Sequence, residues 1–258
     1  DDFEIDQNIA FNSTNSCLKT STDISFVSQS GVDYQIFKGT TLVNNVIGDG
    51  TEQTVEIPET NLTLGLNEFT IVAQHGECAE FIFPESIQIE VEENINTNLS
   101  LITENTCGDS NTAIVIENAQ ANKTYTLQSD GSDISSLTAN SNGELTFSLN
   151  SNQVSTGLNE LDIQIEGEIC GAELSKNKAV FNVYEPINSN LVFVSTDVCN
   201  AAEATIGISN AQAGKIYKLY NGESLVESVT ANTDGELIFA NANNELVQGL
   251  NTFNLKIE

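Results

Sequence analysis

Residues 157–165 read Gly-Leu-Asn-Glu-Leu-Asp-Ile-Gln-Ile, which is a turn followed by a strict alternation of apolar and polar side chains. An alternation with a period of two is typical of a β-strand that buries one face. The same Gly-Leu-Asn triplet opens similar runs at residues 65–67 and 249–251, each 92 positions away. The stretch therefore indicates an all-β fold and, at the same time, a repeated unit.

The cysteines recur in the same register. Cys17, Cys107 and Cys199 are 90 and 92 positions apart, and Cys78 and Cys170 are 92 apart. Further markers at this spacing are Tyr34, Tyr125 and Tyr217, and the string Asn-Ala-Gln-Ala at residues 118–121 and 210–213. A fixed period of this kind is the signature of a tandem repeat architecture.

Each repeat carries short apolar alternations that are separated by turn residues such as Asp49-Gly50, Asn142-Gly143 and Asp234-Gly235. About seven short strands in roughly ninety residues, with frequent turns, favour an immunoglobulin-like β-sandwich. A jelly roll or another small barrel remains an alternative on this pattern alone. The predicted fold class is all-β, with three tandem immunoglobulin-like sandwiches.

The repeats predict three domains, at residues 1–93, 94–186 and 187–258. Residues 1–7 match the linker between repeats, so we expect a preceding domain. The third domain is expected to lack its last strand, because the sequence reaches only Glu258. The linkers are short, which favours a semi-stiff string of domains over freely moving beads.

The charge of the chain is strongly negative. Eight Lys and no Arg stand against 37 Asp and Glu, which gives a net charge of −29. Such a surface repels phosphate backbones and anionic membrane surfaces, so no nucleic-acid partner is expected. No apolar run reaches the length of a membrane span, so no membrane insertion is expected either. The charge suits a self-repelling extended protein, with adaptation to calcium or high salt as the alternative.

The paired cysteines predict one disulfide within each domain. The expected bonds are Cys17–Cys78 and Cys107–Cys170, with Cys199 bonded to a cysteine beyond residue 258. Reduced thiols or a metal site are the alternatives, but one histidine in the chain cannot complete repeated four-ligand zinc sites. Disulfides indicate an oxidising compartment, so the expected location is extracellular or at the cell surface.

The repeats share no set of catalytic residues. Carboxylates are numerous enough for a glycosidase-like pair, but no acidic position is shared by the repeats in a way that suggests such a site. His75 is the only histidine, so no Ser-His-Asp set can recur across the repeats. Calcium is the one cofactor to consider, at acidic turns that begin at Asp49, Asp130 and Asp234 and at the linker residues Glu90, Glu92 and Glu93. None of these turns matches the twelve-residue calcium loop, and plain hairpins are their more typical use. The sequence therefore predicts neither an enzyme nor a cofactor.

The repeat pattern resembles that of a known class of proteins. In the third repeat it reads Cys199, Ile206-Gly-Ile208, Tyr217-Lys-Leu219, Asp-Gly-Glu-Leu at 234–237 and Gly-Leu-Asn-Thr-Phe at 249–253. This resembles the tandem immunoglobulin-like repeats of very large surface adhesins of Bacteroidota, especially flavobacteria, of the gliding-adhesin SprB type. The resemblance implies export by type IX secretion and a role in attachment or gliding motility.

On this interpretation the chain is a structural stalk segment whose partners are other domains of the same long chain. Three alternatives remain open. The chain is a module that binds surface glycans or proteins, a spacer attached to a secreted enzyme, or a subunit that exchanges strands with its neighbours.

Overall fold

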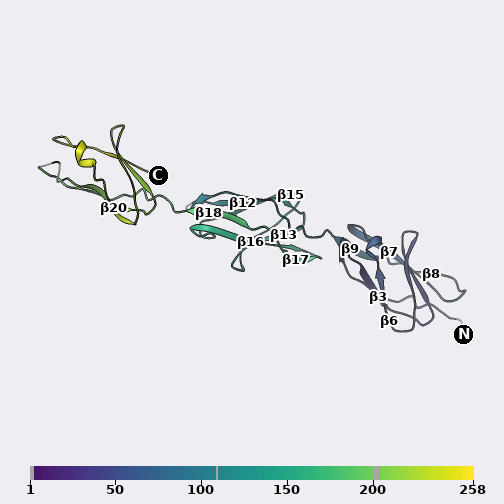
Figure 1. Cartoon of the computed structure of the whole chain (residues 1–258). Helices are drawn as coiled ribbons and strands as arrows, with labels where there is room; N and C mark the ends of the chain where they lie inside the picture. Colours follow the sequence, from purple (N-terminus) through teal and green to yellow (C-terminus); the bar gives the residue numbers. More distant parts are fainter. Residues whose placement is uncertain (1–2, 109, 200, 202–203) are drawn as a thin grey trace. The chain divides into compact units, whose positions relative to one another are not determined.

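The structure, a computed structural model, describes residues 3–108, 110–199, 201 and 204–258. Residues 1 and 2 of the expected linker 1–7 lie outside the described residues. Apart from short 3-10 turns, the regular structure is all β, as the alternation predicts. In Figure 1 the strands of one sandwich have neighbouring colours, because each sandwich is built mainly from one contiguous stretch of sequence.

Sandwich 1 contains the first nine strands. They are β1 (Phe11–Ser13), β2 (Ser16–Cys17), β3 (Thr22–Val27), β4 (Asp33–Lys38), β5 (Thr41–Ile47), β6 (Glu52–Ile57), β7 (Gly65–Gln74), β8 (Phe81–Ile82) and β9 (Ile87–Glu92), with the 3-10 turn η1 (Glu59–Asn61) before β7. One sheet has the order β1-β3-β6, and the other has the order β2-β9-β7-β4-β5 with β8 added to β7. The pairs are antiparallel except β2 with β9, which run parallel.

Sandwich 2 repeats this topology. Its strands are β10 (Leu101–Thr103), β11 (Thr106–Cys107), β12 (Thr112–Ala119), β13 (Thr124–Ser129), β14 (Ser132–Thr138), β15 (Gly143–Leu149), β16 (Gly157–Gly167), β17 (Gly171–Leu174) and β18 (Ala179–Tyr184). One sheet has the order β10-β12-β15, and the other has the order β11-β18-β16-β13-β14 with β17 added to β16. The two sequence repeats therefore fold in the same way, strand for strand.

Sandwich 3 follows the same plan over fewer strands. They are β19 (Phe193–Ser195), β20 (Ile206–Ala211), β21 (Ile216–Asn221), β22 (Ser224–Thr230), β23 (Gly235–Ile238) and β24 (Asn254–Ile257), with the 3-10 turn η3 (Ala242–Glu245). The sheets have the orders β19-β20-β23 and β22-β21-β24. Within the described part of this segment, no strand takes the place that β9 and β18 have in the other two sandwiches.

Three separate hydrophobic cores follow from the alternation, since every second side chain of a strand points inward. Tyr34, Tyr125 and Tyr217 are fully buried in these cores. A buried phenol oxygen needs a hydrogen-bond partner, and each of these oxygens accepts a bond from a main-chain N–H five residues earlier. The donors are Gln29, Gln120 and Gln212, at 2.9, 2.7 and 2.7 Å.

The Gly-Leu-Asn triplet is a turn held by its asparagine. In sandwich 1 the Asn67 side chain donates to the carbonyls of Thr63 and Gly65 and accepts a bond from the Thr63 N–H. Gly65 has a φ of +86°, a backbone conformation that favours glycine. The equivalent side chains, Asn159 and Asn251, make the same set of bonds.

The contacts within the chain define two compact units. The first holds Ser110–Val183 together with the residues up to Thr106, so it contains sandwich 1 and nearly all of sandwich 2. The second holds Tyr184–Glu258 together with Cys107 and its neighbours. The domain boundaries at 93/94 and 186/187 stay a prediction.

Candidate functional site at a junction

The structure contains a disulfide between Cys17 and Cys170, whose Cα atoms are 5.5 Å apart. The predicted pairs Cys17–Cys78 and Cys107–Cys170 are therefore wrong. The bond joins sandwich 1 to sandwich 2 instead of closing either one. Cys78 and Cys199 are exposed and form no disulfide among the described residues. The expectation that Cys199 bonds to a cysteine beyond residue 258 stays a prediction.

The sheet register explains why Cys17 and Cys78 cannot pair. β2, which contains Cys17, pairs with β9 at Val91, and Val91 also pairs with Gly65 at the start of β7. β7 is 10 residues long, and the turn with Cys78 follows its far end. At about 3.3 Å per residue, the two cysteines are separated by about 30 Å along the sheet. A disulfide needs Cα atoms within about 7 Å of each other.

The carboxylate of Glu92, at the end of β9, binds the turn between β16 and β17. It accepts hydrogen bonds from the main-chain N–H groups of Glu168, Ile169 and Cys170, at 3.1, 2.8 and 2.7 Å. Successive N–H groups that converge in a turn form a natural site for an anion. The last strand of sandwich 1 thus fixes the hairpin of sandwich 2 that carries the disulfide.

Lys123 neutralises this carboxylate. Its side chain is 2 % exposed, its Nζ lies 2.7 Å from Glu92 Oε1, and it donates to the Glu93 carbonyl at 2.8 Å. Burial alone raises the pKa of Glu92, but the hydrogen bonds from Lys123 and the turn outweigh burial and hold the pKa below its ordinary value. A Cβ on Gly167 would lie 2.7 Å from Lys123 Nζ, so the absence of a side chain there leaves space for the Glu92–Lys123 ion pair.

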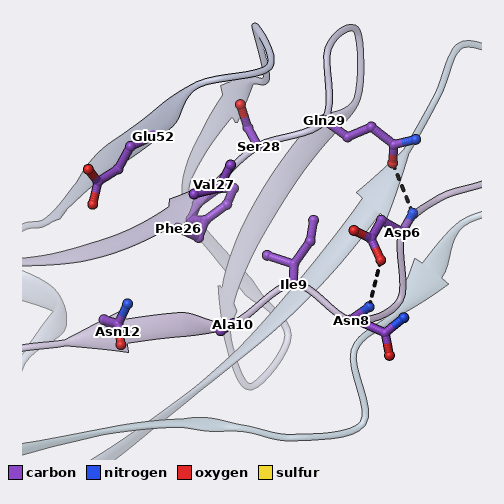
Figure 2. A pocket seen from close by; sticks show the side chains of 10 residues that line it. All are labelled: Asp6, Asn8, Ile9, Ala10, Asn12, Phe26, Val27, Ser28, Gln29 and Glu52. Carbon is purple, nitrogen blue, oxygen red and sulfur yellow. Dashed lines mark hydrogen bonds between the residues drawn. The ribbon is translucent and has the colours of Figure 1, made fainter.

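A glutamine holds the incoming chain segment of each of the three sandwiches. In sandwich 1, Gln29 accepts a bond from the Asp6 N–H at 2.9 Å and donates to the Glu4 carbonyl at 2.8 Å, the first of which is drawn in Figure 2. We call this pair of bonds the glutamine clamp. It recurs at Gln120, with Asn96 and Asn94, and at Gln212, with Asn188 and Pro186.

We define the first junction as Glu92, Glu93, Lys123, the turn at 167–170 and the Cys17–Cys170 bond. In the sequence, Glu92 stood out only as a possible cation ligand, and Lys123 did not stand out. Gln120 lies in the repeated Asn-Ala-Gln-Ala string, which served as a repeat marker without a role. That string could have revealed the clamp, because a glutamine that recurs beside a buried tyrosine suggests that its amide has a binding partner.

Two of the three predicted acidic turns use a carboxylate as a hydrogen-bond acceptor within the chain. Asp49 accepts bonds from the N–H and hydroxyl of Thr51 and from Gln53, and the bonds from Thr51 lower the pKa of Asp49. Asp234 accepts a bond from the Ala213 N–H. Among the described residues, no group of three or more His, Cys, Asp or Glu is placed to hold a metal ion.

A shallow hollow of about 440 Å³ lies beside the incoming segment of sandwich 1 (Figure 2). Its walls are Asp6, Asn8, Ile9, Ala10, Asn12, Phe26, Val27, Ser28, Gln29 and Glu52. The Gln29 and Ser28 side chains are engaged by the main chain, and the Phe26 ring is buried in the core. The described lining thus offers no exposed aromatic face, one of the features by which binding sites are usually recognised.

His75 is half-buried. Its ring stacks on Phe3, with ring centroids 3.7 Å apart. In the part of the chain that the structure describes, no helix has the length and apolar character required to cross a bilayer.

No family model matches the sequence, and no curated protein matches it. Among solved structures, a marsupial T cell receptor superposes with a TM-score of 0.50 at 7% identity, over 89% of this chain and 91% of that one. A human OSCAR ligand-binding domain (TM-score 0.33, 10% identity, 68% of this chain and 97% of that chain) and the I9–I11 tandem of titin (0.28, 11%, 90% and 89%) also align. Their scores are too low to support a conclusion about this chain. The chain is an array of tandem immunoglobulin-like sandwiches.

Proposed function

We propose that this chain is a structural stalk segment of a secreted cell-surface adhesin or filament that serves attachment or gliding motility. The observation that carries the proposal is the covalent bond between sandwiches 1 and 2, because it fixes their separation. The disulfide supports an extracellular location. The repeat pattern supports three domains divided at 93/94 and 186/187, of the kind found in flavobacterial adhesins exported by type IX secretion.

The position of the bond suits a protein that carries tension. Cys17 lies near the start of sandwich 1 and Cys170 lies near the end of sandwich 2. A force applied to the chain termini passes from one cysteine to the other through the disulfide and bypasses the chain between them. Unfolding of either sandwich then adds only the length of the residues outside the bond, which precede Cys17 or follow Cys170. Closing a loop of this size also stabilises the folded state by about 5 kcal/mol in the chain-entropy model.

The experiment is to pull single molecules from their termini, with and without reductant. The bond spans 153 residues, and an extended chain covers about 3.4 Å per residue, so reduction should release about 520 Å of additional length. Cys17→Ser should reproduce the reduced behaviour in the absence of reductant.

Cys78→Ser is the matched control, since Cys78 is exposed and takes no part in the Cys17–Cys170 bond. This variant should extend like the oxidised parent. If the oxidised and reduced chains reach the same length, the bond does not bear the load, and the stalk proposal loses its main support.

A further inference from the structure

Cys78 has the same place in sandwich 1 that Cys170 has in sandwich 2. Each cysteine lies in the turn that follows a long strand, β7 or β16, and the two are 92 positions apart. Cys170 is bonded to the sandwich ahead of it. Cys78 is exposed, and the sheet register keeps it far from Cys17. The internal repeat therefore supplies one example, Cys170, of a cysteine at this position that is bonded to the preceding sandwich.

We propose that Cys78 is the receiving half of a second inter-sandwich disulfide, whose other half is a cysteine at the Cys17 position of a like sandwich attached ahead. The inference goes beyond the stalk proposal, since it holds whether the array serves as a spacer or as a binding module. In the reaction the two thiols lose two protons and two electrons to a small disulfide oxidant such as oxidised glutathione, which leaves as two thiols.

The incoming segment of sandwich 1 follows the same path as that of sandwich 2. Gln29 binds the carbonyl of Glu4 and the N–H of Asp6, as Gln120 binds the equivalent groups two residues apart. A sandwich attached ahead would therefore be delivered to the same end, beside the turn with Cys78. That turn is already formed, because the Cys78 N–H donates to the His75 carbonyl at 3.0 Å.

The residues around this turn replace the buried ion pair of the first junction by apolar contacts. Val32, which has the position of Lys123, is fully buried. His75, which has the position of Gly167, stacks on Phe3. No buried lysine is left here without a carboxylate, so the site does not depend on a counterpart of Glu92.

The test uses the full chain, extended by a second copy of residues 1–92 placed directly before Phe3. The added copy carries Cys78→Ser, so that it offers only Cys17, and Lys19→Arg, so that its peptides differ in mass. The chain is oxidised with glutathione disulfide and digested without reductant. We expect a peptide that joins the added Cys17 to Cys78, beside the bond between the original Cys17 and Cys170.

The matched control has Cys17→Ser in the added copy. Maleimide labelling of Cys78 should be at least tenfold lower in the test chain than in this control. The retained Cys17–Cys170 peptide reports that the natural part of each chain is folded. With that peptide present, an unprotected Cys78 thiol, or an added Cys17 bonded to any other cysteine, overturns the proposal.

Discussion

The incoming segments of sandwiches 2 and 3 share a glutamine clamp and a lysine three residues after the glutamine. Lys123 donates to the Glu93 carbonyl at 2.8 Å, and Lys215 donates to the Glu185 carbonyl at 3.2 Å. Lys123 is buried, whereas Lys215 is half-buried. The lysine bond to the main chain is thus common to both segments, and the burial of the lysine is peculiar to one of them.

The residue at the end of the preceding strand accounts for the difference. Glu92 ends β9 and forms an ion pair with Lys123, whereas Tyr184 ends β18 and is 54% exposed. Removing an ammonium group from water is costly unless a counter-charge is placed beside it. A buried lysine therefore requires the glutamate, and a half-buried lysine can keep part of its hydration without one. The glutamine clamp is thus the device common to both segments, and the Glu92–Lys123 ion pair is a local reinforcement of one of them.

Replacement of the two lysines should separate these contributions most widely. In Lys123→Ala the Glu92 carboxylate keeps its turn N–H donors but loses its buried counter-charge, which typically costs about 3 kcal/mol or more. Lys215→Ala removes one hydrogen bond from a half-buried group, which costs about 1 kcal/mol. The measurement is hydrogen exchange, at the amides of Ile169 and Cys170 for the first variant and at the Asn188 amide for the second.

Exchange at the first pair of amides should be faster by about a hundredfold or more, and at the Asn188 amide by only about fivefold. Equal effects of the two substitutions would contradict the view that the ion pair is a separate reinforcement. The exposed Lys178→Ala serves as the control, because its partner Asp162 is also exposed, and surface pairs of this kind contribute little.

The glutamine clamp should behave alike in both segments. Gln120→Ala and Gln212→Ala each remove two hydrogen bonds to the main chain, so each should cost about 1–3 kcal/mol. Hydrogen exchange at the Asn96 and Asn188 amides, which donate to these side chains, should report losses of similar size. An effect confined to Gln120 would show that the clamp depends on the ion pair, against the comparison made above.

Most of the fold could be predicted from the alternation of apolar and polar residues and from the internal repeat. The period of two identified the strands, and the Gly-Leu-Asn triplet identified a turn whose asparagine closes it in each sandwich. These are local signals, since the side chain's orientation and the turn's hydrogen bonds depend on residues close in sequence. Local signals of this kind can be recognised in a single sequence without any knowledge of tertiary contacts.

The junction was not predictable in the same way, because it depends on which end of a sandwich each residue reaches. The expected pairing of Cys17 with Cys78 assumed that two cysteines of one domain lie at one end of it. The length of β7 places them at opposite ends. Counting residues along that strand from the Gly-Leu-Asn turn could have shown this. The pairing of Lys123 with Glu92 could not be predicted in this way. The two residues are 31 positions apart, and a contact over that separation produces no local sequence pattern.

A pH titration should give the smallest and most selective effect. The folded pKa of Glu92 lies below its ordinary value of 4.5, so its bonds stabilise the junction fully above that pH. This stabilisation should be lost as the pH falls through the folded pKa. Protection of the Cys170 amide, corrected for the intrinsic exchange rate, should therefore be constant near neutral pH and decrease below about 4.5.

The contrast between the two segments supplies the controls. In Glu92→Gln, protection of Cys170 should be lower at neutral pH and lose its dependence on acid, because no carboxylate titrates at that position. The Asn188 amide should keep its protection over the same range, since Tyr184 stands where Glu92 does in the first junction and the clamp amide does not titrate. A parallel fall at Asn188 would mean that acid loosens the sandwiches generally, through the many other carboxylates of this chain, and the decrease at Cys170 could then no longer be assigned to Glu92.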